Sequence, residues 1–215
     1  MTILLLIRHG ENDYYIQKKL PGRLPDIHLN DLGRQKAEAL ITALVGRSVI
    51  AIYSSPLERA VETALPLARH YALEIQLHEG LNELDCGDWK GKSISKLQRL
   101  KAWKSVQQES SRFKFPGGES FMEAQNRVSS ALMEIQANHG EDEVVACFTH
   151  CDMIRLAVAH FLGMPLDDFQ RLSAEPASIT TIYLGKENPR LINLNTTAID
   201  PVGISSHPIT TRPRK

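Results

Sequence analysis

Short apolar runs alternate along the chain with longer amphipathic segments, and this alternation limits the possible folds more than any other feature. The runs at 3–7, 49–53 and 143–148 are almost continuous in apolar residues, which is typical of strands buried on both faces. Segments with helical spacing of apolar residues lie between them. Strands that alternate with helices predict a three-layer α/β/α sandwich with a mostly parallel central sheet.

The same patterns place the other elements. They predict helices at 31–45 (capped by Asn30), 55–71, 93–108, 119–138 and 152–162, and strands at 74–77, 179–184 and 190–194. The helix at 55–71 is expected to start with a capping box, because Ser55 stands three residues before Glu58. We expect one domain over residues 1–199 and a loose tail over 200–215, which contains three prolines.

Composition narrows the class of protein. The 25 Lys and Arg residues balance 25 Asp and Glu residues, which argues against binding of nucleic acid or of a membrane surface through bulk charge. Three cysteines are too few for a disulfide scaffold, and no apolar segment approaches the length of a membrane span. We therefore expect a cytoplasmic domain that binds neither a membrane nor nucleic acid.

Polar segments follow the predicted strands at 8–10, 54–56, 82–84 and 149–151. In a parallel sheet, ligands bind beyond the carboxyl ends of the strands, so these segments should converge in space. The first of them opens a polar loop of about 20 residues, a length that in compact domains usually serves a function or is disordered.

The side chains at this edge suit phosphoryl chemistry. Arg8 and Arg59 offer guanidinium groups, whose forked donors match phosphate or carboxylate oxygens. A neutral imidazole, from His9 or His150, can act as a nucleophile, and the Glu83 carboxyl can give and take a proton. Together these residues suggest transfer of a phosphoryl group through a phosphohistidine.

In its motifs the sequence resembles the histidine phosphatase superfamily, the phosphoglycerate mutase-like proteins. Its Arg8-His9-Gly10 is similar to the signature of that family. The other similar blocks follow in the family's order, and the resemblance covers roughly residues 3–185. They lie at 29–35, 53–63, 81–91, 115–120 and 148–150.

The resemblance implies a role for each of these side chains. His9 would be the nucleophile, while Arg8, Arg59 and His150 would hold the phosphoryl oxygens. Glu83 would protonate the leaving oxygen and then deprotonate the attacking water. No metal and no organic cofactor is implied, and the partner would be a small phosphorylated metabolite.

Some positions depart from the family pattern. Tyr15 stands where an asparagine often lines the pocket, and Asn12 replaces a common Ser or Thr. Cys151 follows the second histidine where glycine is usual. With Gly22, the residues Tyr15 and Cys151 are expected to contact substrate, and their bulk should alter its affinity.

Three functions remain open. A phosphomonoester phosphatase leads, because only 66 residues separate Glu83 from His150, whereas the mutases of the family commonly carry a longer insertion there. The alternative is a 2,3-bisphosphoglycerate-dependent phosphoglycerate mutase, which would use the same phosphohistidine. A non-catalytic module that binds a phosphorylated ligand is the third. The sequence leaves the oligomeric state open, with a homodimer as one option.

Two further features allow alternative interpretations. Cys147, His150 and Cys151 carry ligand types that suit zinc, but their spacing matches no usual four-ligand pattern. The segment from Lys90 to Lys114 holds eight basic residues and one acidic residue. It is either a solvated helix face or a border of the pocket that attracts anions.

Overall fold

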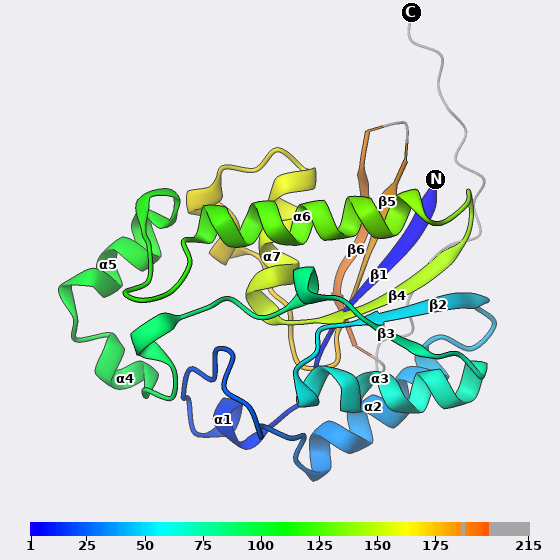
Figure 1. Cartoon of the computed structure of the whole chain (residues 1–215), viewed down its shortest axis with the longest axis horizontal. Helices are drawn as coiled ribbons and strands as arrows, with labels where there is room; N and C mark the ends of the chain where they lie inside the picture. The colour runs from blue at the N-terminus through cyan, green and yellow to red at the C-terminus, as the bar shows by residue number, and fades with distance from the viewer. Residues whose placement is uncertain (186–187, 198–215) are drawn as a thin grey trace, which may run out of the picture.

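A six-stranded sheet forms the centre of the molecule, as a computed structural model that describes residues 1–185 and 188–197 shows (Figure 1). Its order is β3-β2-β4-β1-β5-β6, in which the first four strands are parallel and β5 runs antiparallel to both of its neighbours. The strands are β1 (Thr2–Arg8), β2 (Val49–Ser54), β3 (Ile75–Leu77), β4 (Val144–Thr149), β5 (Ile179–Leu184) and β6 (Arg190–Thr196).

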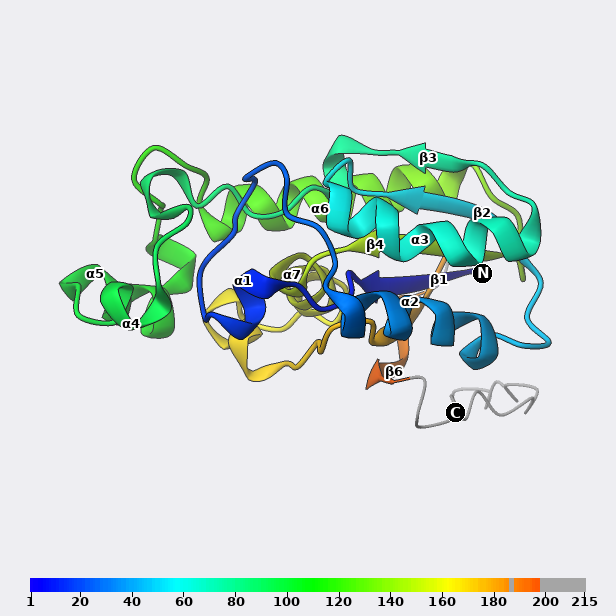
Figure 2. The same cartoon turned by 90° about the horizontal axis from the view of Figure 1, so that it is seen from below.

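Helices cover both faces of this sheet (Figures 1 and 2). The helices are α1 (Asp13–Ile16), α2 (Asp31–Ala43), α3 (Glu58–Tyr71), α4 (Ile94–Leu97), α5 (Lys101–Gln108), α6 (Phe121–Ala137) and α7 (Cys151–Phe161). Along β1, Leu5 and Ile7 pack with α2 and α3, whereas Leu4 and Leu6 pack with α6 and α7. Successive residues of a strand face opposite sides, so a strand between two helix layers must be apolar throughout. The predicted three-layer α/β/α sandwich is confirmed.

The start of α3 corrects one prediction. Ser55 does not cap this helix: α3 begins at Glu58, and Leu57 precedes it without a side-chain cap. The Ser55 hydroxyl instead lies 2.8 Å from His150 Nε2 and accepts a hydrogen bond from the Leu57 amide at 3.3 Å. The hydroxyl thus contacts His150 and the Leu57 amide instead of forming the expected capping box.

The helix expected at 93–108 is divided into α4 and α5. Leu97 and Val106 are both buried in the same apolar cluster. Nine residues correspond to about two and a half turns of an α-helix, so an unbroken helix would place them on opposite sides. The turn between Leu97 and Lys101 allows both side chains to join one core. The mixed helical periodicity of this segment did not reveal the break.

Helices α1, α4 and α5 lie together beyond the carboxyl ends of the parallel strands (Figures 1 and 2). The loop before α2 returns to this edge through a close contact between two glycines. A Cβ on Gly10 would lie 2.7 Å from the carbonyl oxygen of Gly33. A Cβ on Gly33 would lie 2.1 Å from the carbonyl oxygen of Glu11. Only residues without a side chain allow the first turn of α2 to pack so closely on the segment that follows β1.

The limits of the domain stay a prediction. The tail expected at 200–215 lies outside the described residues. Within the described ranges, no helix has the length and apolar character that crossing a membrane requires.

Candidate active site

The segments that follow β1, β2, β3 and β4 converge at one edge of the sheet, as the topology predicted. The rings of His9 and His150 lie with their centroids 5.2 Å apart. Glu83 Oε2 lies 3.5 Å from His150 Nδ1 and 4.0 Å from Arg59 Nη2. Arg8, His9 and Glu83 line a pocket of about 540 Å³, and the fully buried Arg59 and His150 lie directly behind Glu83.

His9 is fixed in one tautomer. Its Nδ1 lies 2.7 Å from the Gly10 carbonyl oxygen, which can only accept, so Nδ1 carries the proton. Burial, followed by the charges of Arg59 and Arg8, holds the pKa of His9 well below its usual range, so the ring is neutral near pH 7. Nε2 therefore bears a lone pair, as a nucleophilic imidazole requires.

Arg59 is a buried cation with unused donors. Its Nη2 donates to the Gly22 carbonyl at 2.8 Å, but Nε and Nη1 have no hydrogen-bond partner among the described residues. Burial lowers its pKa despite the opposing charge of Glu83. Arg8 is similar, because Nη1 donates to the Ala174 carbonyl at 2.6 Å while its buried Nε finds no partner in the described chain. Buried unpaired donors are costly, and an anion in the pocket would satisfy them.

His150 supplies another donor. Burial, and then the charges of Arg59 and other neighbours, lowers its pKa far below the usual range, so this ring is also neutral. Ser55 already accepts the Leu57 amide and can donate its hydroxyl proton to Nε2 at 2.8 Å. When the Ser55 hydroxyl donates in this way, the ring proton lies on Nδ1, which makes no hydrogen bond within the described ranges.

Glu83 is poised to exchange a proton. Burial is the main reason that the pKa of its carboxyl rises to about 7, against the opposing effect of Arg59. Its Oε1 accepts a hydrogen bond from the Leu84 amide at 2.9 Å. A carboxyl that titrates near neutrality can serve as an acid in one step and as a base in the next.

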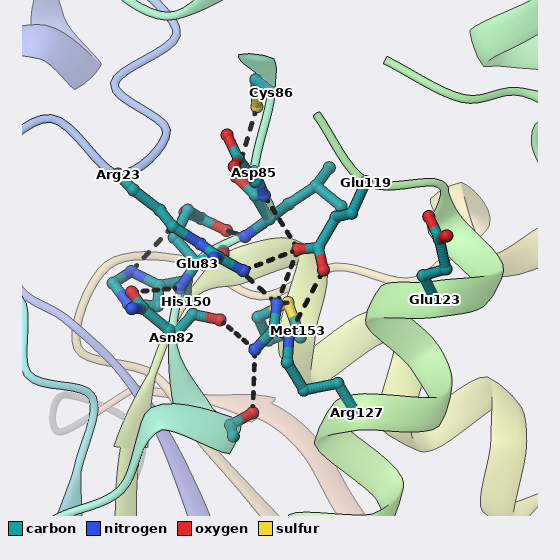
Figure 3. A network of polar contacts seen from close by, with 12 residues as sticks. Arg23, Asn82, Glu83, Asp85, Cys86, Glu119, Glu123, Arg127, His150 and Met153 are labelled. Atoms are coloured by element: carbon teal, nitrogen blue, oxygen red, sulfur yellow. Dashed lines mark hydrogen bonds and ion pairs between the residues drawn. The ribbon is translucent and has the colours of Figure 1, made fainter. Parts of the chain in front are cut away.

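An arginine network holds the backbone at Glu83 (Figure 3). The carbonyl oxygen of Glu83 accepts from Arg23 Nε at 2.7 Å and from Arg127 Nη2 at 3.3 Å. Glu119 Oε1 in turn accepts from Arg23, Arg127 and the Asp85 amide at 3.0, 2.7 and 2.8 Å. This network fixes the position of the segment that carries Glu83.

Some of these supporting residues are not recognisable from the sequence. Glu119 lies in one of the motif blocks and Ser55 in another, but each was given no role at the site. Arg127 lies in the middle of α6, where a charged residue has no signal of its own. Only the folded chain shows that it donates to the carbonyls of Gly80 and Asn82 as well as to Glu83.

The expected substrate-contacting residues lie in different places. Tyr15 and Cys151 line the pocket, where the Arg8 guanidinium lies 5.2 Å from the centre of the Tyr15 ring. Gly22 does not line the pocket as described and instead binds Arg59 through its carbonyl. Of the eight basic residues between Lys90 and Lys114, all of them described, none lines the pocket.

The site suits an anion better than a cation. One ligand atom each from His9, Glu83 and His150 lie within 4.8 Å of one another, an arrangement that could hold a metal ion. However, the Arg59 guanidinium beside them opposes a second positive charge. The cysteines suggested as zinc ligands are not in this group, and burial raises the pKa of the Cys151 thiol to about 11, which disfavours the thiolate that zinc needs.

Comparison with known proteins agrees with this geometry. The family model described as "Histidine phosphatase superfamily (branch 1)" matches residues 4–197. Phosphoserine phosphatase 1 of Hydrogenobacter thermophilus is 29% identical over 199 residues, which cover 92% of this chain and 93% of that protein. Glucosyl-3-phosphoglycerate phosphatase of Mycolicibacterium vanbaalenii is 30% identical over 178 residues, which cover 77% of this chain and 76% of its own length.

Solved structures are similar over nearly the whole chain. A mycobacterial glucosyl-3-phosphoglycerate phosphatase in complex with VO3 superposes with a TM-score of 0.83 at 28% identity, covering 91% of this chain and 99% of that one. Phosphoserine phosphatase from Entamoeba histolytica in complex with 3-phosphoglyceric acid gives a TM-score of 0.80 at 27% identity, covering 92% and 98%.

Proposed function

Because the chain belongs to the histidine phosphatase superfamily, branch 1, we propose that it is a phosphomonoester phosphatase that acts through a phosphohistidine at His9. One observation carries the proposal: a neutral His9 lies beside His150 and in the field of Arg8 and Arg59, and each of these three residues has a buried donor with no partner among the described residues. Nucleophile and anion-binding groups are thus both present at one pocket. The similar phosphatases of known structure support this assignment.

In the first step, His9 Nε2 attacks the phosphorus and the bond to the leaving oxygen breaks. Glu83, protonated at this stage, gives its proton to that oxygen, and the free alcohol departs. Arg8, Arg59 and His150 Nδ1 bind the phosphoryl oxygens in a transition state that depends mainly on positioning and on charge stabilisation.

In the second step, a water molecule attacks the phosphorus of the phosphohistidine. The carboxylate of Glu83 takes a proton from this water, and the phosphorus–nitrogen bond breaks with its electron pair returning to Nε2. Inorganic phosphate leaves, and both His9 and Glu83 recover their initial protonation states. No cofactor enters either step.

We propose a small phosphorylated metabolite as the substrate and the cytoplasm as the compartment. Similar proteins are named for phosphoserine and for glucosyl-3-phosphoglycerate. The cysteines Cys86, Cys147 and Cys151 are free thiols, as in a reducing compartment. The bisphosphoglycerate-dependent mutase remains the runner-up.

A screen of phosphorylated metabolites with and without 2,3-bisphosphoglycerate tests the proposal. A phosphatase should release phosphate without that compound and should form an acid-labile phosphoenzyme on mixing with substrate. Turnover only with 2,3-bisphosphoglycerate would instead indicate the mutase. Binding of phosphate esters without hydrolysis of any of them would indicate the non-catalytic module.

The rate should decrease at alkaline pH because Glu83 must be protonated to donate. With its pKa near 7, kcat/KM should fall about tenfold per pH unit above that value. Protonation of His9 should not lower kcat/KM between pH 7 and 6, because the pKa of His9 lies well below its usual range. Steady-state kinetics from pH 5 to 9 measures both effects.

Replacing Glu83 by glutamine should lower kcat by about 10²–10⁴-fold and remove the alkaline decline. The native carboxyl also holds its proton between pH 4.5 and about 7, where the unfolded chain has lost it, so this group makes stability fall as pH rises through that window. In thermal unfolding, the E83Q variant should lack this pH-dependent contribution to stability. The control Glu74→Gln, at an exposed residue, should have the kcat and the pH-dependent stability of wild type. An unchanged pH–rate profile in E83Q would contradict the role.

Ser55→Ala should lower kcat by about tenfold, which corresponds to one hydrogen bond. Without the Ser55 hydroxyl, His150 loses the contact that places its proton on Nδ1. The exposed Ser48→Ala is the matched control. An increase in KM with kcat unchanged would argue that Ser55 acts on substrate binding rather than on the histidine.

A further inference from the structure

The catalytic pocket borders a second cavity that differs in chemical character. This annex has a volume of about 210 Å³ and shares Leu20, Ile94, Asp152 and Arg155 with the catalytic pocket. Most of its remaining wall is apolar and aromatic, contributed by Leu84, Trp89, Trp103, Val106, Phe115 and Phe121. These four residues place the two cavities side by side, so a leaving group that extends past them from a phosphoryl group at His9 would enter the annex.

We propose that the annex binds an apolar ring on the leaving alcohol, so that the preferred substrates are phosphomonoesters of small aryl or arylalkyl alcohols. This inference rests on the proposed phosphatase function. It differs from the substrates for which the similar proteins are named, phosphoserine and glucosyl-3-phosphoglycerate, which are strongly polar.

The volume sets the size of the ring. A protein cavity of about 150 Å³ with apolar walls binds benzene. The annex, at about 210 Å³, therefore accommodates one six-membered ring with a short linker. A sugar of similar size would fit only with its hydroxyl groups unpaired, which costs free energy for each group.

Some polar groups around the annex already have partners inside the protein. Gln170 Nε2 donates to the Val106 carbonyl at 2.7 Å, and the Cys86 thiol donates to the Leu84 carbonyl at 3.4 Å. At the border with the catalytic pocket, Arg155 Nη1 and Asp152 Oδ1 form an ion pair at 3.3 Å. Arg155 Nε, at the same border, is buried and has no partner among the described residues, so it can bind a polar group of the ligand there, whereas most of the remaining annex wall is apolar.

The aromatic rings of the annex wall pack against one another, which limits their movement. Trp89 packs edge-on against Phe115, with ring centroids 5.3 Å apart, and stacks on Trp103 at 6.2 Å. Phe115 in turn contacts Phe121 at 5.3 Å. Aromatic rings favour edge-to-face and offset-stacked contacts, which a ligand ring can join.

Hydrolysis of a substrate series measures the preference. Phenyl, benzyl and 2-phenylethyl phosphate should include at least one substrate whose kcat/KM exceeds that of phosphoserine by about 10–200-fold. Val106→Phe places a ring in the annex and should remove most of this ratio, whereas Val45→Phe, on an exposed valine, should retain it. Trp103→Ala enlarges the annex and should shift the preference towards naphthyl phosphate.

Binding can be measured without turnover, because the only two tryptophans of the chain, Trp89 and Trp103, both line the annex. Phenylphosphonate and benzylphosphonate, which cannot be hydrolysed, should change tryptophan fluorescence on titration. Methylphosphonate should bind at the phosphoryl site with little change. In Val106→Phe, the arylphosphonate signal should be lost.

The outcomes separate the two proposals. If phosphoserine is hydrolysed but no aryl ester is preferred and arylphosphonates leave the fluorescence unchanged, the annex inference is wrong and the phosphatase function stands. If no ester is hydrolysed but arylphosphonates change the fluorescence, the annex binds rings and the proposed function fails. Equal behaviour of V106F and wild type in both assays would also overturn the annex inference.

Discussion

His9→Ala is expected to lower kcat by about 10⁵–10⁶-fold, the order found when an enzyme loses its nucleophile. The variant lacks the nitrogen that would bond to phosphorus, and we expect no other imidazole of the described residues to replace it. His150 is the neighbouring ring, but its Nε2 already contacts Ser55. Initial-rate measurements on the best substrate of the screen give the ratio of the kcat values of wild type and variant. His70→Ala, at an exposed histidine, is the control.

The same variant should still bind inorganic phosphate, because Arg8, Arg59 and His150 remain in place. Titration calorimetry can measure this, and the variant should form no phosphoenzyme. Turnover in His9→Ala close to that of wild type would show that another residue is the nucleophile. Loss of both phosphate binding and folding would require a second variant, such as His9→Asn, to separate the two effects.

Arg59→Met should lower kcat/KM by about 10³–10⁵-fold, the range reported for arginines that stabilise phosphoryl transfer. Methionine fills part of the same space but offers no hydrogen-bond donor. Because Nε and Nη1 of Arg59 are buried without a described partner, the cation should act mainly on the bound phosphoryl group. Kinetics on the variant and on Arg69→Met, an exposed residue of the same helix, tests this.

The variant should be at least as resistant to thermal unfolding as wild type. A fully buried guanidinium carries a desolvation penalty, and Glu83, the carboxyl 4.0 Å from it, can take up a proton when the cation is removed, so that no unpaired buried charge remains. Calorimetry should therefore show an unchanged or higher Tm in Arg59→Met together with the loss of activity. A Tm well below that of wild type would mean that Arg59 mainly supports the fold, through its hydrogen bond to Gly22.

The fold was largely predictable from the sequence because its strands are buried on both faces. Leu4 to Ile7 are apolar on every residue, and such runs are recognisable without knowledge of the partners. Where a prediction of a helix start or of an unbroken helix was wrong, contacts with distant residues, and not the local sequence pattern, determine the structure. Ser55 has the features of a helix cap, yet its hydroxyl contacts His150, which lies 95 positions further along the chain.

The candidate site also contains residues that could be predicted from the sequence and residues that could not. His9, Glu83 and His150 follow strands, so their meeting at one edge could be expected from topology alone. Their supports could not be expected. The contacts of Arg127 with the carbonyls before and at Glu83 depend on how α6 packs against that segment, and the annex exists only because α4 and α5 are separate helices.

The contact between Gly10 and Gly33 makes residues 11–32 a closed loop whose two ends touch. The backbone N–H of Asn30 donates to the Glu11 carbonyl at 3.1 Å, and this hydrogen bond also holds the two ends of the loop together. This loop carries Tyr15 and several other residues of the pocket wall. Because it leaves and returns to one point, its length and composition can vary while His9 keeps its place. Gly22 and Arg23 are exceptions, because they bind Arg59 and the Glu83 carbonyl, so the loop can vary freely only at its other positions.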